Sequence, residues 1–136
     1  FNTFFNLATE AAQQTCLHGV AATLAPEGRF VLEAFVPEPD AHDGVSVREV
    51  SVDRVMLDVV AIDRTAQTIT GQRIVMTAAG NRFFPYLLRY ATPDQLDAMA
   101  GDAGLERVDR TEDWRGTPFS NNSSYHVSTW CRADAT

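Results

Sequence analysis

The sequence has 136 residues, of which 45% are hydrophobic, and a formal net charge of -7 with a pI near 4.8. This length and apolar content fit one globular domain and exclude a disordered chain. All eleven basic residues are arginines and they are spread along the sequence, so we expect no nucleic-acid partner. No apolar run is long enough to cross a bilayer, and we expect a soluble, cytoplasmic protein without a membrane partner.

The histidines and cysteines show no metal-binding pattern. His18, His42 and His126 have no ligand spacing, and Cys16 and Cys131 have no CxxC spacing. We therefore predict no metal site. A disulfide framework has equally little support, so both thiols are expected to be free and buried.

The first part of the chain predicts a helix followed by a buried strand. Thr9 is a suitable N-cap, and apolar residues recur at helical spacing as far as Leu24. The stretch RFVLEAFVP (29–37) is almost continuously apolar, with Glu33 as its one carboxylate. Such a run is typical of a strand covered on both faces in a parallel sheet. Helix, turn and strand together predict the second half of a βαβ unit, whose first strand ends at Phe1.

The middle of the chain predicts antiparallel strands. Apolar and polar residues alternate along residues 45–63 and 68–77, as in half-exposed strands. Gly71 and Gly80 predict turns or a bulge. Pro85, in the next extended run, argues for an edge strand or a break.

Residues 92–104 predict a capped helix. Thr92 and Gln95 form the S/T-x-x-E/Q capping box, Pro93 stands at the first helical position, and Gly104 suits the C-cap. Two strand-like segments follow this helix, so the chain is expected to end in an antiparallel hairpin.

Five segments occur in an order that resembles a known enzyme family: NTFFNL (2–7), TEAAQQTCLHGVAATL (9–24), APEG (25–28), RFVLEAFVP (29–37) and LRYATPDQLDAMAGDAGL (88–105). In this order they resemble class I S-adenosylmethionine-dependent methyltransferases. More narrowly, they are similar to bacterial small-molecule methyltransferases with an extra antiparallel layer between the fifth strand and the last helix. The resemblance covers essentially the whole chain but only the family's C-terminal half.

The resemblance implies an α/β fold: the C-terminal half of a Rossmann-like class I methyltransferase fold, with an inserted antiparallel β-layer and a C-terminal antiparallel hairpin. Residues 1–136 are expected to form a single, partial domain that lacks the N-terminal cofactor-binding half. The family's GxGxG turn and ribose-binding carboxylate have no counterpart in this sequence. We therefore expect a truncated form of a longer encoded protein, and a fragment that alone binds S-adenosylmethionine weakly and is inactive.

The same resemblance implies methyl transfer from S-adenosylmethionine to a nitrogen, oxygen or carbon of a small-molecule acceptor. Such chemistry depends on holding donor and acceptor in line and needs no nucleophilic side chain, so no catalytic residue is assigned. The alternative is a non-catalytic small-molecule-binding or dimerisation domain. A GxGxG turn after a strand in the upstream gene sequence would favour the enzyme.

The resemblance also implies site residues near the start of the chain. In the family, the loop after the fourth strand lies beside the reactive methyl group. Asn2 and Thr3 inherit its cofactor-binding position, and Phe5 and Asn6 inherit contacts with the acceptor. The alternative is that the two asparagines satisfy backbone groups of the loop, as asparagine often does in turns.

An aromatic-lined pocket for the acceptor is expected from five further residues: Tyr86, Arg89, Tyr90, Trp114 and His126. Ordinary packing is the alternative for the aromatic residues, and a solvated ion pair is the alternative for Arg89. A role of His126 as general base is a further hypothesis.

The strand at 29–37 also predicts self-association. If its neighbouring strand is missing, an open backbone edge lies between Phe30, Leu32 and Phe35, and such edges recruit further strands. We expect a homodimer through this exposed sheet edge unless the rest of the protein covers it.

Overall fold

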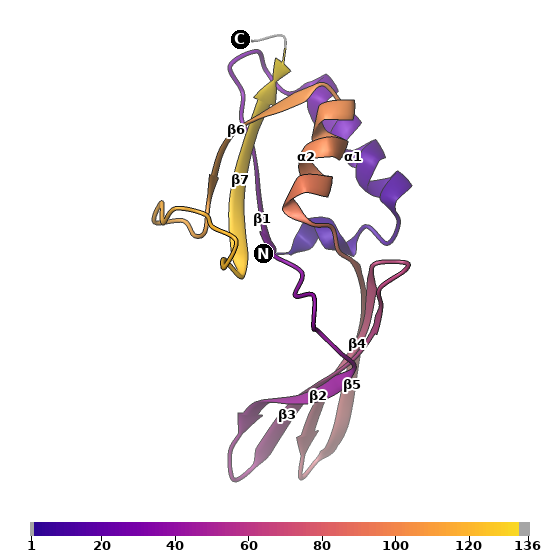
Figure 1. Ribbon diagram of the computed structural model, residues 1–136. Helices are drawn as coiled ribbons and strands as arrows, with labels where there is room; N and C mark the ends of the chain where they lie inside the picture. The colour runs from indigo at the N-terminus through magenta and orange to yellow at the C-terminus, as the bar shows by residue number, and fades with distance from the viewer. Residues whose placement is uncertain (1, 134–136) are drawn as a thin grey trace. The chain divides into compact units, whose positions relative to one another are not determined.

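The computed structural model describes residues 2–133, which form two compact units (Figure 1). Unit 1 contains residues 2–38 and 91–133, and unit 2 contains Pro39–Tyr90. Unit 2 is therefore an insertion in the chain of unit 1. The single domain expected from the sequence stays a prediction.

Unit 1 is a three-stranded antiparallel sheet with two helices on one side of it (Figure 1). The strand order is β1-β7-β6. Its elements are η1 (Thr3–Asn6), α1 (Glu10–Thr23), β1 (Phe30–Phe35), α2 (Pro93–Asp102), β6 (Leu105–Thr111) and β7 (Tyr125–Arg132). Its core includes Leu17, Leu32, Leu96 and Trp130, each at most 6% exposed. The predicted terminal hairpin is confirmed, because β6 pairs with β7.

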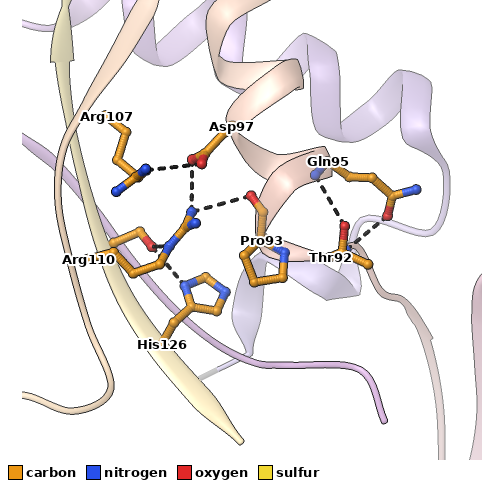
Figure 2. Close-up of polar contacts among 8 residues, drawn as sticks. Thr92, Pro93, Gln95, Asp97, Arg107, Arg110 and His126 are labelled. Atoms are coloured by element: carbon orange, nitrogen blue, oxygen red, sulfur yellow. Dashed lines mark hydrogen bonds and ion pairs between the residues drawn. The ribbon is translucent and has the colours of Figure 1, made fainter. Parts of the chain in front are cut away.

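The two helices begin and end where the sequence predicts. At the start of α1, the Thr9 hydroxyl accepts a hydrogen bond from Ala12 N at 3.1 Å. The predicted capping box opens α2: Thr92 Oγ1 accepts from Gln95 N at 3.2 Å, and Gln95 Oε1 accepts from Thr92 N at 2.9 Å (Figure 2). Gly104 follows this helix with a φ of 84°, a left-handed conformation that suits glycine. None of the helices described is long and apolar enough to cross a membrane.

Strand β1 differs from the sequence prediction. Burial alternates along it, with Leu32 and Ala34 buried and Val31 42% exposed. Within residues 2–133 it pairs only with β7, antiparallel, and it is the edge strand of its sheet. The prediction of a strand covered on both faces is therefore wrong for the part of the chain described, because both helices lie on one side of the sheet. The predicted strand ending at Phe1 lies outside the described residues.

Unit 2 is a four-stranded antiparallel meander with the order β2-β3-β4-β5. Its strands are β2 (Gly44–Val50), β3 (Arg54–Asp63), β4 (Thr68–Thr77) and β5 (Gly80–Arg89). The predicted antiparallel layer is thus confirmed. So is the edge position of Pro85, since β5 ends the sheet. Gly80 has a φ of 123° at the turn between β4 and β5, as predicted for a turn glycine.

Gly71 has a different role from the predicted turn or bulge. It lies inside β4, opposite Tyr86 of β5. A Cβ atom at Gly71 would lie 2.0 Å from Cζ of Tyr86, so the phenol ring lies directly over the glycine backbone. A glycine inside a strand often marks this kind of close approach.

We predict that Gly71→Ala destabilises unit 2 by about 1–3 kcal/mol, because the new methyl group displaces the Tyr86 ring. The measurement is hydrogen exchange of the β4 and β5 amides. In a Tyr86→Ala background the same substitution is expected to cost much less, since the two sites are in contact. An equal cost in both backgrounds would show that the ring does not constrain Gly71.

Candidate functional site

Unit 1 contains an open cavity of about 530 Å³ beside η1 and β1. Its walls come from η1 and the turn after it, from one residue of α1, from β1, and from the loop between β6 and β7. The lining residues are Thr3, Phe4, Leu7, Cys16, Phe30, Val31, Leu32, Glu33 and Trp114. Most of this lining is apolar, as in cavities that bind small organic molecules.

The polar groups of this cavity are few and close together in the fold. Glu33 supplies a carboxylate from β1, and Thr3 supplies a hydroxyl from η1. Trp114 lines the cavity together with Glu33. Trp114 is nevertheless 67% exposed, so its ring forms an accessible wall. A carboxylate beside an aromatic wall suits a ligand that has an ammonium or hydroxyl group next to an apolar part.

Asn2, Phe5 and Asn6 belong to unit 1. The amide oxygen of Asn2 accepts a hydrogen bond from the backbone N–H of Phe35 at 2.9 Å, which ties η1 to the end of β1. Phe5 is fully buried, and its ring meets that of Phe35 edge-on at 5.1 Å. Asn6 is exposed. These contacts match the alternative in which Asn2 satisfies a backbone group, and the binding roles of all three residues stay predictions.

Tyr86, Arg89 and Tyr90 belong to unit 2. Tyr86 lies over Gly71, and burial, followed by the nearby Asp58 carboxylate, raises the pKa of its phenol. Arg89 is buried at the end of β5. The backbone N–H of Tyr90 donates to the carbonyl of Gln67 at 2.9 Å. The acceptor-binding roles of these residues stay predictions.

A polar network around Arg110 joins α2 to the sheet of unit 1 (Figure 2). The Arg110 guanidinium donates to the Asp97 carboxylate at 2.8 Å, to the Pro93 carbonyl at 3.3 Å and to the Ser128 hydroxyl at 2.7 Å. The same carboxylate accepts from Arg107 at 3.0 Å. The Arg110 side chain is 6% exposed and the Asp97 side chain is 28% exposed, so this ion pair is partly buried.

His126 completes this network from β7. Its ring Nδ1 lies 2.9 Å from the Ser128 hydroxyl, and its ring packs edge-on against Phe119 at 6.3 Å. Burial, followed by the positive charge of Arg110, lowers the pKa of His126 to about 4. A group with a pKa this low is a weak base, so near pH 7 it takes up a proton poorly. His126 is therefore better suited to hydrogen bonding in the core than to general-base catalysis.

Comparison with known proteins shows which fold the helices and strands of this chain belong to. No protein-family model matches the chain, and no curated protein matches its sequence. Solved structures do match. The CcbJ methyltransferase from Streptomyces caelestis is 36% identical with a TM-score of 0.92, over 98% of this chain and 55% of that one. The chain is part of a class I methyltransferase fold. This confirms the resemblance predicted from the sequence.

Two further methyltransferase structures are similar to the chain. CalS10, an amino pentose methyltransferase from Micromonospora echinaspora whose structure has S-adenosylmethionine bound, is 27% identical with a TM-score of 0.63, over 95% of this chain and 55% of CalS10. A methyltransferase from Clostridium acetobutylicum shares the fold at 6% identity and a TM-score of 0.83, over 97% of this chain and 55% of that one. The chain thus spans about half the length of these methyltransferases.

The sequence predicted two of the residues that line the cavity and gave no signal for most of the others. Thr3 and Trp114, two predicted site residues, line the same cavity. Cys16 was expected to be buried, but it is half-buried because it forms part of the cavity wall; Cys131 is buried, and both thiols are free. Phe4 and the other apolar lining residues gave no signal beyond ordinary core packing. Within residues 2–133 no three histidine, cysteine, aspartate or glutamate side chains lie close enough to hold a metal ion.

We predict that Asp97→Ala lowers the free energy of unfolding by about 1–3 kcal/mol, because it leaves the Arg110 guanidinium without its charged partner. Urea unfolding followed by tryptophan fluorescence reports on this, since both tryptophans lie in unit 1. Asp102→Ala, at an exposed position of the same helix, is the matched control and should change stability by roughly 0.5 kcal/mol or less. Equal effects of the two substitutions would contradict a stabilising role for the ion pair.

A pH dependence follows from His126. The pKa of its imidazole is about 4 in the folded state and about 6.5 when unfolded. Between these values the unfolded chain binds more protons, so stability is lost as the pH falls from about 6.5 to 4, by up to about 3 kcal/mol. His126→Asn removes the titration and keeps a polar group near the Ser128 hydroxyl.

The measurement is urea unfolding of the natural protein and of His126→Asn at several pH values across this window. The Asp97→Ala variant is not used here, because it alters the charge beside the imidazole. With His126→Asn, the free energy of unfolding should fall less steeply with decreasing pH than in the natural protein. A decline of the same steepness in both proteins would assign the acid sensitivity to other groups.

Proposed function

We propose that the protein to which this chain belongs transfers a methyl group from S-adenosylmethionine to a nitrogen, oxygen or carbon atom of a small-molecule acceptor. The observation that carries this proposal is the similarity to CcbJ, at 36% identity over 98% of the chain. Similarity to CalS10, an amino pentose methyltransferase, supports a small and polar acceptor. The cytoplasmic location expected from the sequence stays a prediction.

The chain's own residues fit only part of what this reaction needs. They include no glycine-rich turn to approach a nucleotide, so the site for most of the cofactor is proposed to lie outside them. The bound cofactor supplies the methyl group on a positively charged sulfur. The open cavity at η1 and β1 supplies apolar walls and one carboxylate, which can orient an acceptor.

Roles within the cavity follow from its geometry. We assign Thr3, with Asn2, to the cofactor side, because both lie on or next to η1. We assign Trp114 and Glu33 to the acceptor side, because a carboxylate beside an indole ring can hold an amine or hydroxyl group in place. No residue is proposed to attack the methyl group, because the acceptor itself is the nucleophile.

The test is a methyl-transfer assay on the protein with its complete natural sequence. Radiolabelled S-adenosylmethionine is offered with a panel of small amines, amino sugars and phenols, and both the labelled product and S-adenosylhomocysteine are measured. Trp114→Ala is expected to lower kcat/KM by roughly tenfold or more, the cost of about 1.4 kcal/mol of lost transition-state binding. Val108→Ala, at an exposed position of β6, is the matched control and should leave the rate unchanged.

A complete protein that neither binds S-adenosylmethionine in calorimetry nor methylates any member of the panel would overturn the proposal. In that case the alternative, a non-catalytic binding or dimerisation domain, would account for the fold. For the 136-residue chain alone we expect weak cofactor binding and no activity, and micromolar binding would show that the cofactor site is built from these residues.

A further inference from the structure

Unit 2 contains a cavity of about 490 Å³ at the end of its sheet where β4 turns into β5. It is lined from β3, β4 and β5, which lie side by side in this order (Figure 1). Its polar lining consists of Arg54, Thr77, Asn81 and Arg82, and its largest apolar side chain is Phe84. No aspartate or glutamate of residues 2–133 lines it, so its walls would not repel a negatively charged ligand.

The strand registers bring the two arginines of this cavity to one face of the sheet. Arg54 pairs with Thr77, and Thr77 pairs with Gly80. Two residues along, Val75 pairs with Arg82. Residues two apart on a strand point to the same face, and the strands on either side of β4 are about 10 Å apart. The two guanidinium groups therefore flank β4, and long side chains of this kind can reach one ligand from both sides.

The turn between β4 and β5 keeps the space between the arginines open. Gly80 has a φ of 123°, a conformation that favours glycine, and a Cβ atom there would have no neighbour within 4 Å. The Thr77 hydroxyl donates to the Gly80 carbonyl at 3.1 Å, which closes the turn. Since this hydroxyl is already engaged, the donors that remain for a ligand are the two guanidinium groups and the Asn81 amide.

Neither of these arginines is fully satisfied within residues 2–133. Nε of Arg54 lies 3.8 Å from a carboxylate oxygen of Glu49, too far for a hydrogen bond, and this buried nitrogen has no hydrogen-bond partner in that range. The Arg82 guanidinium forms no ion pair with any carboxylate of the same residues. A guanidinium has five N–H donors in a planar fork that matches the oxygens of a carboxylate or phosphate. Two incompletely paired guanidinium groups at one cavity thus favour an oxyanion.

The other charges on this side of the sheet do not neutralise the cavity. Asp58 forms ion pairs with Arg48 at 3.0 Å and with Arg73 at 2.9 Å. Because two arginines already share this one carboxylate, it has little capacity left for the arginines of the cavity. Positive charge therefore remains at the end of the sheet, although the whole chain has a net charge of -7.

We propose that this cavity of unit 2 binds the oxyanion group of a small organic acid, a carboxylate or a phosphate ester. Arg54 and Arg82 hold the anion, and the Asn81 amide donates a further hydrogen bond. Phe84 is 49% exposed and lies two residues from Arg82 on the same strand, so its ring is placed to pack against the apolar part of the same molecule. The proposal does not depend on methyl transfer.

The experiment measures binding of phenyl phosphate and of benzoate by calorimetry, with the protein in its complete natural sequence. Arg54→Gln and Arg82→Gln should each raise the dissociation constant of the bound acid by roughly tenfold or more, because each removes a charged hydrogen-bond donor. Arg29→Gln is the matched control. It removes the same charge from an exposed position of unit 1 and should leave binding unchanged. Tighter binding of phenyl phosphate assigns the site to phosphate esters, and tighter binding of benzoate assigns it to carboxylates.

A further variant keeps the test decisive if an arginine substitution disturbs folding, which circular dichroism would reveal. Phe84→Leu keeps an apolar side chain on β5 but removes the ring. It should weaken binding of the aromatic acid severalfold and leave the weaker binding of inorganic phosphate unchanged. A natural protein that binds neither phenyl phosphate nor benzoate at millimolar concentration would overturn the proposal. Binding that is unaffected by both Arg54→Gln and Arg82→Gln would overturn it equally, because the acid would then be held elsewhere.

Discussion

The buried guanidinium of Arg110 is the interaction on which the arrangement of unit 1 depends. It reaches the carboxylate and the backbone of α2 and the hydroxyl of Ser128 on β7, and it lies 5.5 Å from the centre of the Phe119 ring. One side chain of β6 therefore connects the helix, the neighbouring strand and the loop between the two strands. Burying a charge in this way is favourable only with good geometry and full hydrogen bonding. Asp97 and Ser128 provide that geometry, and Ser128 in turn positions His126.

The same network explains why a histidine is tolerated in the core. Imidazole loses its charge more readily than a carboxylate or a guanidinium would, because its ordinary pKa already lies close to neutral. Burial near Arg110 favours the neutral ring, which then needs only hydrogen-bonding partners. Ser128 supplies one of them, while the other ring nitrogen, Nε2, has no partner among the described residues. His126 is thus adapted to an interior position beside a fixed positive charge.

The sequence predicted those parts of the fold that are encoded by neighbouring residues. The capping box at Thr92 and Gln95 contains its own geometry within four positions, so the start of α2 followed directly from the residues. The pairing of Asp97 with Arg110 joins residues thirteen positions apart, and nothing in either local pattern distinguishes them from solvated charges. Gly71 was misjudged for a similar reason. A glycine is required at this position because the ring of Tyr86 on the next strand lies over it. That pairing is visible only in the strand register.

The candidate site was predictable to the same limited extent. Trp114 and Thr3 were expected to contribute, and both line the cavity, but their common surroundings depend on how a loop, a short 3-10 helix and a strand edge meet. The proposed class of reaction rests on the likeness in fold, which extends over nearly the whole chain. It says little about the acceptor, since one fold supports many substrates. The acceptor has to be argued from the cavity, where a single carboxylate beside an exposed indole favours a molecule that presents a hydrogen-bond donor next to an apolar surface. The fold and the cavity are independent observations, and the reaction class rests on the first while the chemistry of the acceptor rests on the second.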